Sequence, residues 1–309
     1  GFLGGRGDVT LAEDAAYAAL SKLGQQLKLA PEAAALGMLR VVNAVMERAL
    51  RRVSVERGHD PRDFTLVPFG GAGPLHACDM AAAVGIQRIL IPPAPGVLSA
   101  YGMLVADIAS DAAQSILRSS VDLLSNLTPL ETALATLDAR VRAVLLAEGV
   151  ATPNVTVALD MRYRGQSYEL TVPVKTPLDA AALQAGVNAF HQLHEQRYGY
   201  AMPEESVQVV TLRVRGSGPG AQAALPREPL GNADPTPAHL RDKEVWFGGD
   251  AATITPCYAR DKLSAGQRFA GPALVLQFDA TTVVAPGWSA HVDEFHNLWL
   301  ERPLSSEGR

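Results

Sequence analysis

Apolar residues recur at every third or fourth position from Pro31 to Gly58, with polar residues between them. This spacing places the apolar side chains on one face of a helix, so the pattern predicts a single long amphipathic helix. Gly58 followed by Pro61 marks its end, because glycine and then proline commonly terminate helices. The residues of the predicted apolar face are Leu36, Leu39, Val42, Val45, Met46, Ala49 and Val53.

A β-α-β unit is predicted directly after this helix. The apolar run Thr65–Phe69 predicts a strand, residues Pro74–Val84 a helix, and Arg88–Ile91 a second strand. Two strands joined through a helix usually pair in parallel with a right-handed crossover, and we expect that arrangement here.

The middle of the chain predicts an α+β domain. Its elements are a helix at Leu124–Glu148, a hairpin of strands Val155–Tyr163 and Ser167–Val174, a helix at Ala180–Tyr198 and a strand at Val207–Arg215.

The last part of the chain predicts a small β barrel or sandwich, preceded by a linker rich in glycine, proline and alanine at Gly216–Pro237. Three domains are therefore expected, at residues 1–118, 119–216 and 217–309. The expected strands of the last domain are Lys243–Phe247, Ala252–Ala259, Ala273–Phe278, Thr281–Val284, Ala290–Val292 and Asn297–Leu300.

A glycine-rich segment, Gly70-Gly71-Ala72-Gly73, joins the predicted strand at Thr65–Phe69 to the helix that Pro74 begins. Glycine leaves no side chain in the way, so main-chain amides can approach an anion or a purine ring. Proline suits a first helical turn, and the positive end of the helix dipole would point back at the glycines. The segment predicts nucleotide binding, although it lacks the Lys-Ser/Thr ending of a P-loop and the glycine spacing of a dinucleotide fingerprint. A structural turn without a ligand is the alternative.

Composition narrows the class of protein. With 309 residues and 48% hydrophobic content, the chain is long enough for about two domains with real cores. The formal charge of −5 and the pI near 5.8 argue against nucleic acid as a partner. No run of about eighteen apolar residues predicts a membrane span, and the start of the chain does not resemble a signal peptide. We therefore expect a cytoplasmic enzyme.

Other residues with reactive chemistry give weaker signals. The two cysteines, Cys78 and Cys257, indicate no disulfide framework, and Cys78 is expected to be a small buried side chain. His191 and His194 have the spacing of a metal-ligand pair on a helix, yet no third ligand is evident. A solvated helix face is the preferred interpretation, and no metal site is predicted.

Two further groups are candidates for substrate contact. The first group could hold a carboxylate or lactam, but a structural role in strand-edge protection and aromatic packing is the preferred interpretation. In the second, Asp279 would cap its own turn. The members are Arg162, Arg164, Gln166, Tyr198 and Tyr200 in the first group and Asp279 and Thr281 in the second.

Six longer segments follow one another in an order that is informative as a set. They are Arg51–Phe64, Phe69–Ala77, Pro92–Ala100, Glu195–Tyr200, Val210–Arg215 and Gly271–Trp288. These motifs resemble the hydantoinase A/5-oxoprolinase family, which includes N-methylhydantoinase, 5-oxoprolinase and acetone or acetophenone carboxylase subunits. The resemblance covers nearly the whole chain and implies that the chain is the carboxy-terminal portion of such a protein.

The resemblance implies an α/β fold, half of an actin-like, ribonuclease H-like ATPase, followed by α+β and β-rich domains. Such ATPases bind ATP and Mg²⁺ between two lobes. Their Asp-x-Gly-Gly-Thr phosphate hairpins lie in the amino-terminal portion and are absent from this sequence. The chain starts at Gly1 rather than Met, so we expect a fragment of a longer polypeptide that lacks the first lobe and the metal-binding acidic residues.

The resemblance also implies which residues bind the cofactor and which reaction is catalysed. The residues that would lie against adenosine and its α-phosphate are Gly70, Gly71, Ala72, Gly73 and His76, although a core position is the preferred interpretation for His76. The expected function is ATP-dependent opening of cyclic amides such as hydantoin, N-methylhydantoin or 5-oxoproline, with a B-type subunit as partner. The alternatives are a ketone carboxylase subunit and, for the isolated chain, a non-catalytic assembly module. The roles of Asn43 and Arg48, which also resemble family positions, do not follow from the sequence.

Overall fold

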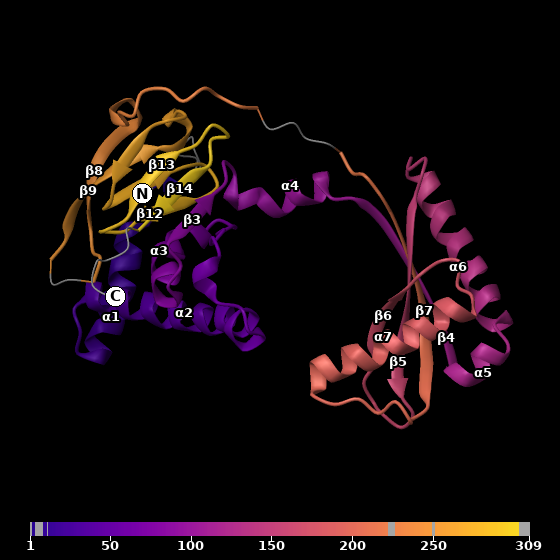
Figure 1. Cartoon of the computed structure of the whole chain (residues 1–309). Coiled ribbons are helices and arrows are strands. Elements are labelled where there is room, and N and C mark those ends of the chain that lie inside the picture. Colours follow the sequence, from indigo (N-terminus) through magenta and orange to yellow (C-terminus); the bar gives the residue numbers. More distant parts are fainter. Residues whose placement is uncertain (1, 4–8, 11, 222–225, 249–250, 303–309) are drawn as a thin grey trace, which may run out of the picture. The chain divides into compact units, whose positions relative to one another are not determined.

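The computed structural model describes residues 2–3, 9–10, 12–221, 226–248 and 251–302. Contacts divide the chain into two compact units, residues 1–103 with 224–309, and residues 104–223 (Figure 1). The polypeptide therefore leaves the first unit, forms the second and returns to the first. Each unit is described below by itself.

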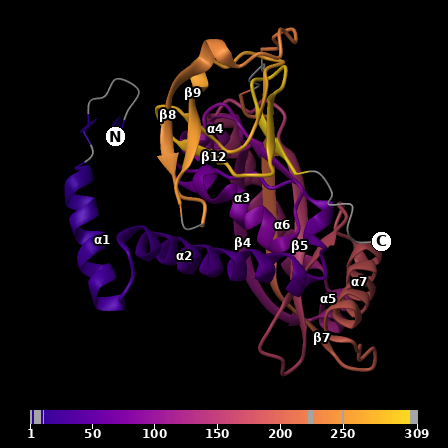
Figure 2. The ribbon, with the colours of Figure 1, turned by 90° about the vertical axis from the view of Figure 1, so that its left-hand side faces the viewer.

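The first unit begins with a two-residue strand pair and three helices. Figure 2 shows α1 and α2 meeting at a bend. Among the described residues, no single helix has the length and apolar character to cross a membrane. The segments Glu13–Leu27 and Pro31–Arg57 reach that length and character only when taken together, and they are bent by 86° relative to each other. The elements are β1 (Phe2–Leu3), β2 (Val9–Thr10), α1 (Glu13–Leu27), α2 (Pro31–Val53) and α3 (Gly73–Val84), with short 3₁₀ turns η1 (Val55–Arg57) and η2 (Pro61–Asp63).

Two four-stranded sheets complete the first unit. One sheet has the order β10-β13-β14-β3 and is antiparallel throughout; the other has the order β12-β11-β9-β8, in which only β11 and β9 are parallel. The strands are β3 (Arg88–Ile91), β8 (His239–Val245), β9 (Thr253–Ala259), β10 (Arg268–Ala270), β11 (Ala273–Leu276), β12 (Thr281–Val284), β13 (Ser289–Val292) and β14 (Leu298–Glu301), with 3₁₀ turns η3 (Pro95–Val97), η4 (Thr236–Ala238) and η5 (Arg260–Lys262).

One apolar core spans the two ends of the sequence in this unit. Strand β3 pairs along its whole length with β14, from Ile91 opposite Leu298 to Arg88 opposite Glu301. Ala77 and Ala81 of α3 are buried in the same cluster as residues of the late strands. The β-rich end of the chain thus supplies the surface on which α3 packs.

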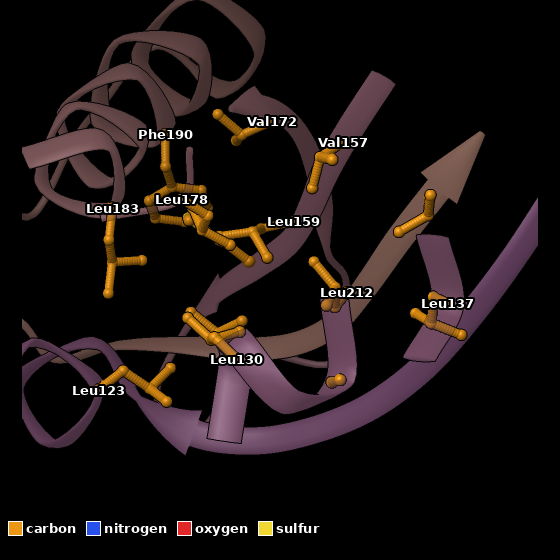
Figure 3. Close-up of a cluster of buried hydrophobic side chains, with 14 of the residues drawn as sticks. Leu123, Leu130, Leu137, Val157, Leu159, Val172, Leu178, Leu183, Phe190 and Leu212 are labelled. Carbon is orange, nitrogen blue, oxygen red and sulfur yellow. The ribbon is translucent and has the colours of Figure 1, made fainter. Parts of the chain in front are cut away.

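The second unit is an antiparallel sheet of order β4-β7-β5-β6 with helices packed on it. Helix α6 contacts β4 and β7, and α7 contacts β6. Figure 3 shows side chains of the helices and strands gathered in its core, including Leu130, Phe190 and Leu159. Its elements are β4 (Ile108–Ser119), α5 (Ser120–Ser125), α6 (Thr128–Ala147), β5 (Asn154–Tyr163), β6 (Leu170–Val174), α7 (Ala180–Tyr198) and β7 (Val207–Gly218); α4 (Leu98–Val105) leads into it.

Several predicted elements are confirmed. Strand β3 and helix α7 have the expected bounds, and the predicted hairpin is β5 with β6. Helix α7 is well defined because Asp179 accepts a hydrogen bond from Ala182 N at its start and Gly199 adopts a φ of 81° at its end. The mixed α/β class predicted from the sequence is likewise observed.

The strand predicted at Thr65–Phe69 is wrong. Only Leu66 pairs, in one parallel bridge to Ile89, so the predicted β-α-β unit is reduced to that bridge. Pro68 has no N–H to donate and Gly70 turns the chain at a φ of 80°, which prevents a longer ladder. Helix α1 and strand β4 were not predicted at all.

The long helix predicted from Pro31 also differs from expectation. It ends at Val53 instead of Gly58, and much of its predicted apolar face is solvent-exposed. Leu39, Val42 and Val45 are 40%, 46% and 53% exposed, so within the first unit this face has little covering.

Candidate functional site

The glycine-rich loop lies between the Leu66 bridge and α3, and the backbone of the loop is fixed by hydrogen bonds. Gly70 N donates to Pro95 O at 2.8 Å, and Gly73 N donates to Gly70 O at 3.3 Å. The φ of 80° at Gly70 is a conformation that side-chain-bearing residues rarely adopt, which explains glycine at this position. The loop is thus held against the proline-rich loop at η3.

A turn from the late part of the chain covers the same place. Asp279 Oδ2 accepts a hydrogen bond from Gly96 N at 2.7 Å, and Gln277 Nε2 donates to Asp279 Oδ1 at 2.5 Å. A Cβ at Gly71 would lie 3.2 Å from Asp279 O, and one at Gly96 only 2.6 Å from it. Part of the glycine requirement therefore comes from this turn, which approaches the backbone closely. Asp279 binds across to Gly96, so the expected capping of its own turn is wrong.

The amino terminus of α3 has no side-chain cap. Its N-cap residue is Ala72, Pro74 stands in the first turn, and no acidic side chain is present there. The positive end of the helix dipole consequently faces the glycine loop without compensation from the chain itself. Gly71 and Ala72 are exposed, so the loop is open to solvent. This arrangement suits an anionic group of a ligand.

His76 belongs to a chain of three polar side chains that links α2 to α3. Asn43 Nδ2 donates to Asp79 Oδ2 at 2.8 Å, and Asn43 Oδ1 lies 2.8 Å from His76 Nδ1. Sequence reasoning singled out His76 and Asn43 but not Asp79. The i, i+3 spacing of His76 and Asp79 was the available signal, since it places both on one helix face.

A cavity of about 810 Å³ adjoins this chain of side chains. Its walls are α2, α3, the turn after β8, and residues around β11 and β12. None of Gly70, Gly71, Ala72 and Gly73 lines it, whereas His76 does. Of the predicted cofactor residues, therefore, only His76 lies in the cavity wall. Arg48 does not line this cavity either.

Cys78 also lines the cavity but is poorly suited to nucleophilic chemistry. Only 3% of it is exposed, and its Sγ donates to Val283 O at 3.3 Å. Burial raises the pKa of the Cys78 thiol to about 12, so almost no thiolate is present at neutral pH. The expectation of a small buried side chain is confirmed.

The histidine pair of α7 is a structural feature of the second unit. His194 is fully buried, so the solvated face expected for it is wrong. Its Nδ1 lies 2.8 Å from Tyr200 O, and its ring stacks among Tyr163, Tyr168 and Tyr198. In the described part of the chain, no group of three or more His, Cys, Asp or Glu side chains could hold a metal ion.

The arginines of the predicted lactam site have structural partners or lie apart. Arg162 Nε donates to Gln208 Oε1 at 3.0 Å, and Arg162 also faces Glu169. Arg164 is exposed, and its backbone N–H donates to Ser206 O. Gln166 instead approaches the buried His194 at 3.3 Å. Arg162 and Gln166 therefore have partners within the second unit, whereas the side chain of Arg164 is exposed.

Comparison with known proteins agrees with the motifs of the glycine loop. A model of the hydantoinase/oxoprolinase family matches residues 1–112, and a model of the hydantoinase/oxoprolinase carboxy-terminal domain matches residues 119–302. The chain belongs to the hydantoinase/oxoprolinase family. The predicted resemblance is thereby confirmed.

Individual hydantoinase/oxoprolinase relatives extend over nearly all of this chain. The alpha subunit of caprolactamase from Pseudomonas jessenii is 32% identical over 294 residues, which is 93% of this chain and 42% of the relative. The crystal structure of ATP-dependent caprolactamase from the same organism has a TM-score of 0.76 at 29% identity and covers 97% of this chain and 44% of its own.

A nucleotide-free structure of acetone carboxylase has a TM-score of 0.77 at 23% identity, covering 96% of this chain and 44% of its own. At this identity the comparison establishes a shared fold. The chain thus spans less than half the length of these relatives.

Proposed function

We propose that this chain is the carboxy-terminal part of an ATP-dependent amidohydrolase that opens cyclic amides such as hydantoin, N-methylhydantoin or 5-oxoproline. The observation that carries the proposal is the uncapped amino terminus of α3 behind the Gly70–Gly73 loop, in which Gly71 and Ala72 are exposed. Membership of the hydantoinase/oxoprolinase family and the likeness to an ATP-dependent caprolactamase support it.

The loop residues fit the polyphosphate end of a nucleotide. Gly71 and Ala72 present backbone rather than bulky side chains to solvent, and the dipole of the twelve-residue helix α3 favours negative charge at this end. Bound ATP would supply phosphorylation of the amide oxygen, which makes the carbonyl carbon a better electrophile for water. We assign the part of the chain before residue 118 to one lobe of an actin-like ATPase on the same grounds.

Among the described residues, no group of three or more His, Cys, Asp or Glu side chains could hold a metal ion by itself. Mg²⁺ is usually held by one or two carboxylates and the substrate phosphates. We propose, from the resemblance to this class of ATPase, that the protein ligands of Mg²⁺ belong to the amino-terminal lobe.

The exposed apolar face of α2 is consistent with such a lobe as a partner. Val41, Val42 and Val45 are each 46% or more exposed on this helix. A contiguous exposed apolar surface usually marks an interaction site. We propose that the amino-terminal lobe covers it, with a B-type subunit as a further partner. Light scattering should then show self-association of this chain alone, and a monomer at all concentrations would contradict the proposal.

Calorimetric titration with MgATP and MgADP tests nucleotide binding at the loop. We expect binding in the micromolar to millimolar range, lost in Gly71→Val. Gly102→Val is the matched control, because a Cβ at Gly102 meets no atom within 4 Å. Since Gly71→Val also presses on Asp279 O, circular dichroism must show that the variant remains folded. Absence of binding by the unaltered chain would contradict a nucleotide site within this chain.

A ketone carboxylase subunit is the second candidate function, favoured by the fold shared with acetone carboxylase. The two candidates differ in their products. Incubation with ATP, the B-type partner and either a lactam or a ketone with bicarbonate would separate ring opening from carboxylation. Partner binding without either reaction would instead favour an assembly module.

A further inference from the structure

The hydrogen bonds among Asn43, Asp79 and His76 determine which ring nitrogen of His76 carries the proton. A carboxylate can only accept hydrogen bonds, so the Asn43 atom facing Asp79 at 2.8 Å is its amide nitrogen. The oxygen of the Asn43 amide therefore faces His76 Nδ1, and that nitrogen must carry the proton. In the neutral imidazole, Nε2 is left with a lone pair, and none of the described residues forms a hydrogen bond with it.

The cavity is built by one face of each helix. Leu36, Leu39, Asn43 and Glu47 on α2 line it at spacings of three and four residues, as do His76, Asp79 and Ala83 on α3. The hydrogen-bonded side chains of Asn43 and Asp79 therefore form a polar part of the cavity wall, between the two helices. His76 is partly exposed.

The lining favours a neutral ligand with an apolar body. Among the described lining residues, the two arginines Arg40 and Arg302 are matched by the two carboxylates of Glu47 and Asp79. Glu47 is further paired with Arg51, its Oε1 accepting from Arg51 Nε at 2.7 Å. Formal charges in the wall thus cancel, and no excess charge attracts an ion. Most other lining positions are apolar, including Leu75, Phe247, Val283 and Trp288.

We propose that this cavity binds a neutral cyclic amide carrying an apolar substituent, and that His76 Nε2 accepts a hydrogen bond from the ring N–H. A volume of about 810 Å³ is within the range of cavities that hold such compounds. A donor N–H complements the free Nε2 lone pair, and the apolar substituent complements the aromatic and aliphatic walls. Arg40, one turn before Asn43 on α2, also lines the cavity and can donate to the ring carbonyl.

The choice of a cyclic amide as ligand rests on the proposed function. The location of the site and the preference for a neutral ligand rest on the cavity itself. The proposal assigns His76 to the amide rather than to the nucleotide. His76 is then a specificity-determining residue, and Asn43 and Asp79 are positioning residues that hold its proton on Nδ1.

The test is a binding titration of the unaltered chain, followed by NMR, without nucleotide. The probes are 5-phenyl-2-pyrrolidinone and its N-methyl counterpart, in which a methyl group replaces the hydrogen on the ring nitrogen. We expect the N-methyl compound to bind about tenfold more weakly, because it cannot donate to His76 and leaves Nε2 without a partner. Equal binding of the two probes, or no binding of either at millimolar concentration, would overturn the proposal.

Three variants separate recognition from folding. His76→Phe should remove the difference between the probes, and His76→Gln, which keeps an acceptor at the same distance along the side chain, should restore part of it. His59→Phe is the control, since His59 is exposed and does not line the cavity. A preference for the N–H probe that survives in His76→Phe would overturn the assignment of His76.

The nucleotide arm distinguishes this proposal from the proposed function. Gly71→Val should retain binding of 5-phenyl-2-pyrrolidinone while losing MgADP, because Gly71 is not in the cavity wall. Displacement of the lactam by adenosine would overturn the proposal and make the cavity a nucleoside site. If the unaltered chain does not bind MgADP but still prefers the N–H probe, only the proposed nucleotide site is contradicted.

Discussion

Gly96 N donates a 2.7 Å hydrogen bond to Oδ2 of Asp279, although the two residues are 183 positions apart in the chain. This bond joins the proline-rich loop after β3 to the turn between β11 and β12. The glycine loop of α3 lies against both, through Gly70 N to Pro95 O and through Gly71 beside Asp279 O. The geometry of the proposed phosphate-binding loop therefore depends on the late part of the sequence.

Gly96→Ala should destabilise the first unit. The added Cβ would lie 2.6 Å from Asp279 O, which is backbone and cannot move aside cheaply. We expect a loss of about 1–3 kcal/mol in the free energy of unfolding, the usual cost of overpacking. Urea denaturation measures it, with Gly102→Ala as the control because its Cβ meets nothing within 4 Å. Equal effects of the two substitutions would refute the close approach.

Asn43→Leu should change the protonation of the His76 ring. The leucine removes the acceptor of Nδ1–H, so the proton is free to move to Nε2. Nitrogen-15 NMR of the ring distinguishes the two tautomers. We expect Nδ1–H in the unaltered protein and a larger share of Nε2–H in the variant, while the signals of the exposed His59 stay unchanged. Nε2–H as the main tautomer of the unaltered protein would refute the arrangement.

Both cysteines should resist thiol reagents in the folded protein. Cys78 and Cys257 are 3% and 0% exposed, and burial raises the pKa of each thiol, that of Cys78 to about 12. Because the thiolate is the reactive form, we expect negligible modification by a disulfide reagent at pH 8 and full modification of both in urea. Rapid labelling of Cys78 without denaturant would show that its helix opens locally.

Stability should fall at acid pH partly through Asp293. Burial raises the pKa of this carboxyl, but hydrogen bonds from Asn297, Trp299 and the backbone outweigh burial and leave the pKa below its ordinary value. A depressed folded-state pKa contributes stability above the unfolded-state pKa, which is lost as pH falls through the folded-state pKa. Unfolding measured at pH 7 and below pH 4 should show a smaller pH dependence in Asp293→Asn. An unchanged dependence would exclude Asp293 as a contributor.

The sequence by itself determined the elements whose signals are local. Helix α7 and strand β3 were predicted with their observed bounds, and α3 to within one residue, because caps, glycines and apolar spacing act over a few positions. Gly85, for example, ends α3 with a φ of 83°. The family motifs around Gly70–Gly73 were likewise readable without a structure.

Only the tertiary structure decided which distant segments meet. It paired β3 with β14, reduced the strand predicted at Thr65–Phe69 to one bridge, and buried His194, which looked like a surface residue in its helical pattern. It also placed His76 with Asn43 and Asp79 in the wall of a cavity that the glycine loop does not line. The physical reason is that strand pairing, burial and hydrogen bonds across 183 residues depend on packing of the whole core, whereas propensity and capping depend on a residue's immediate neighbours.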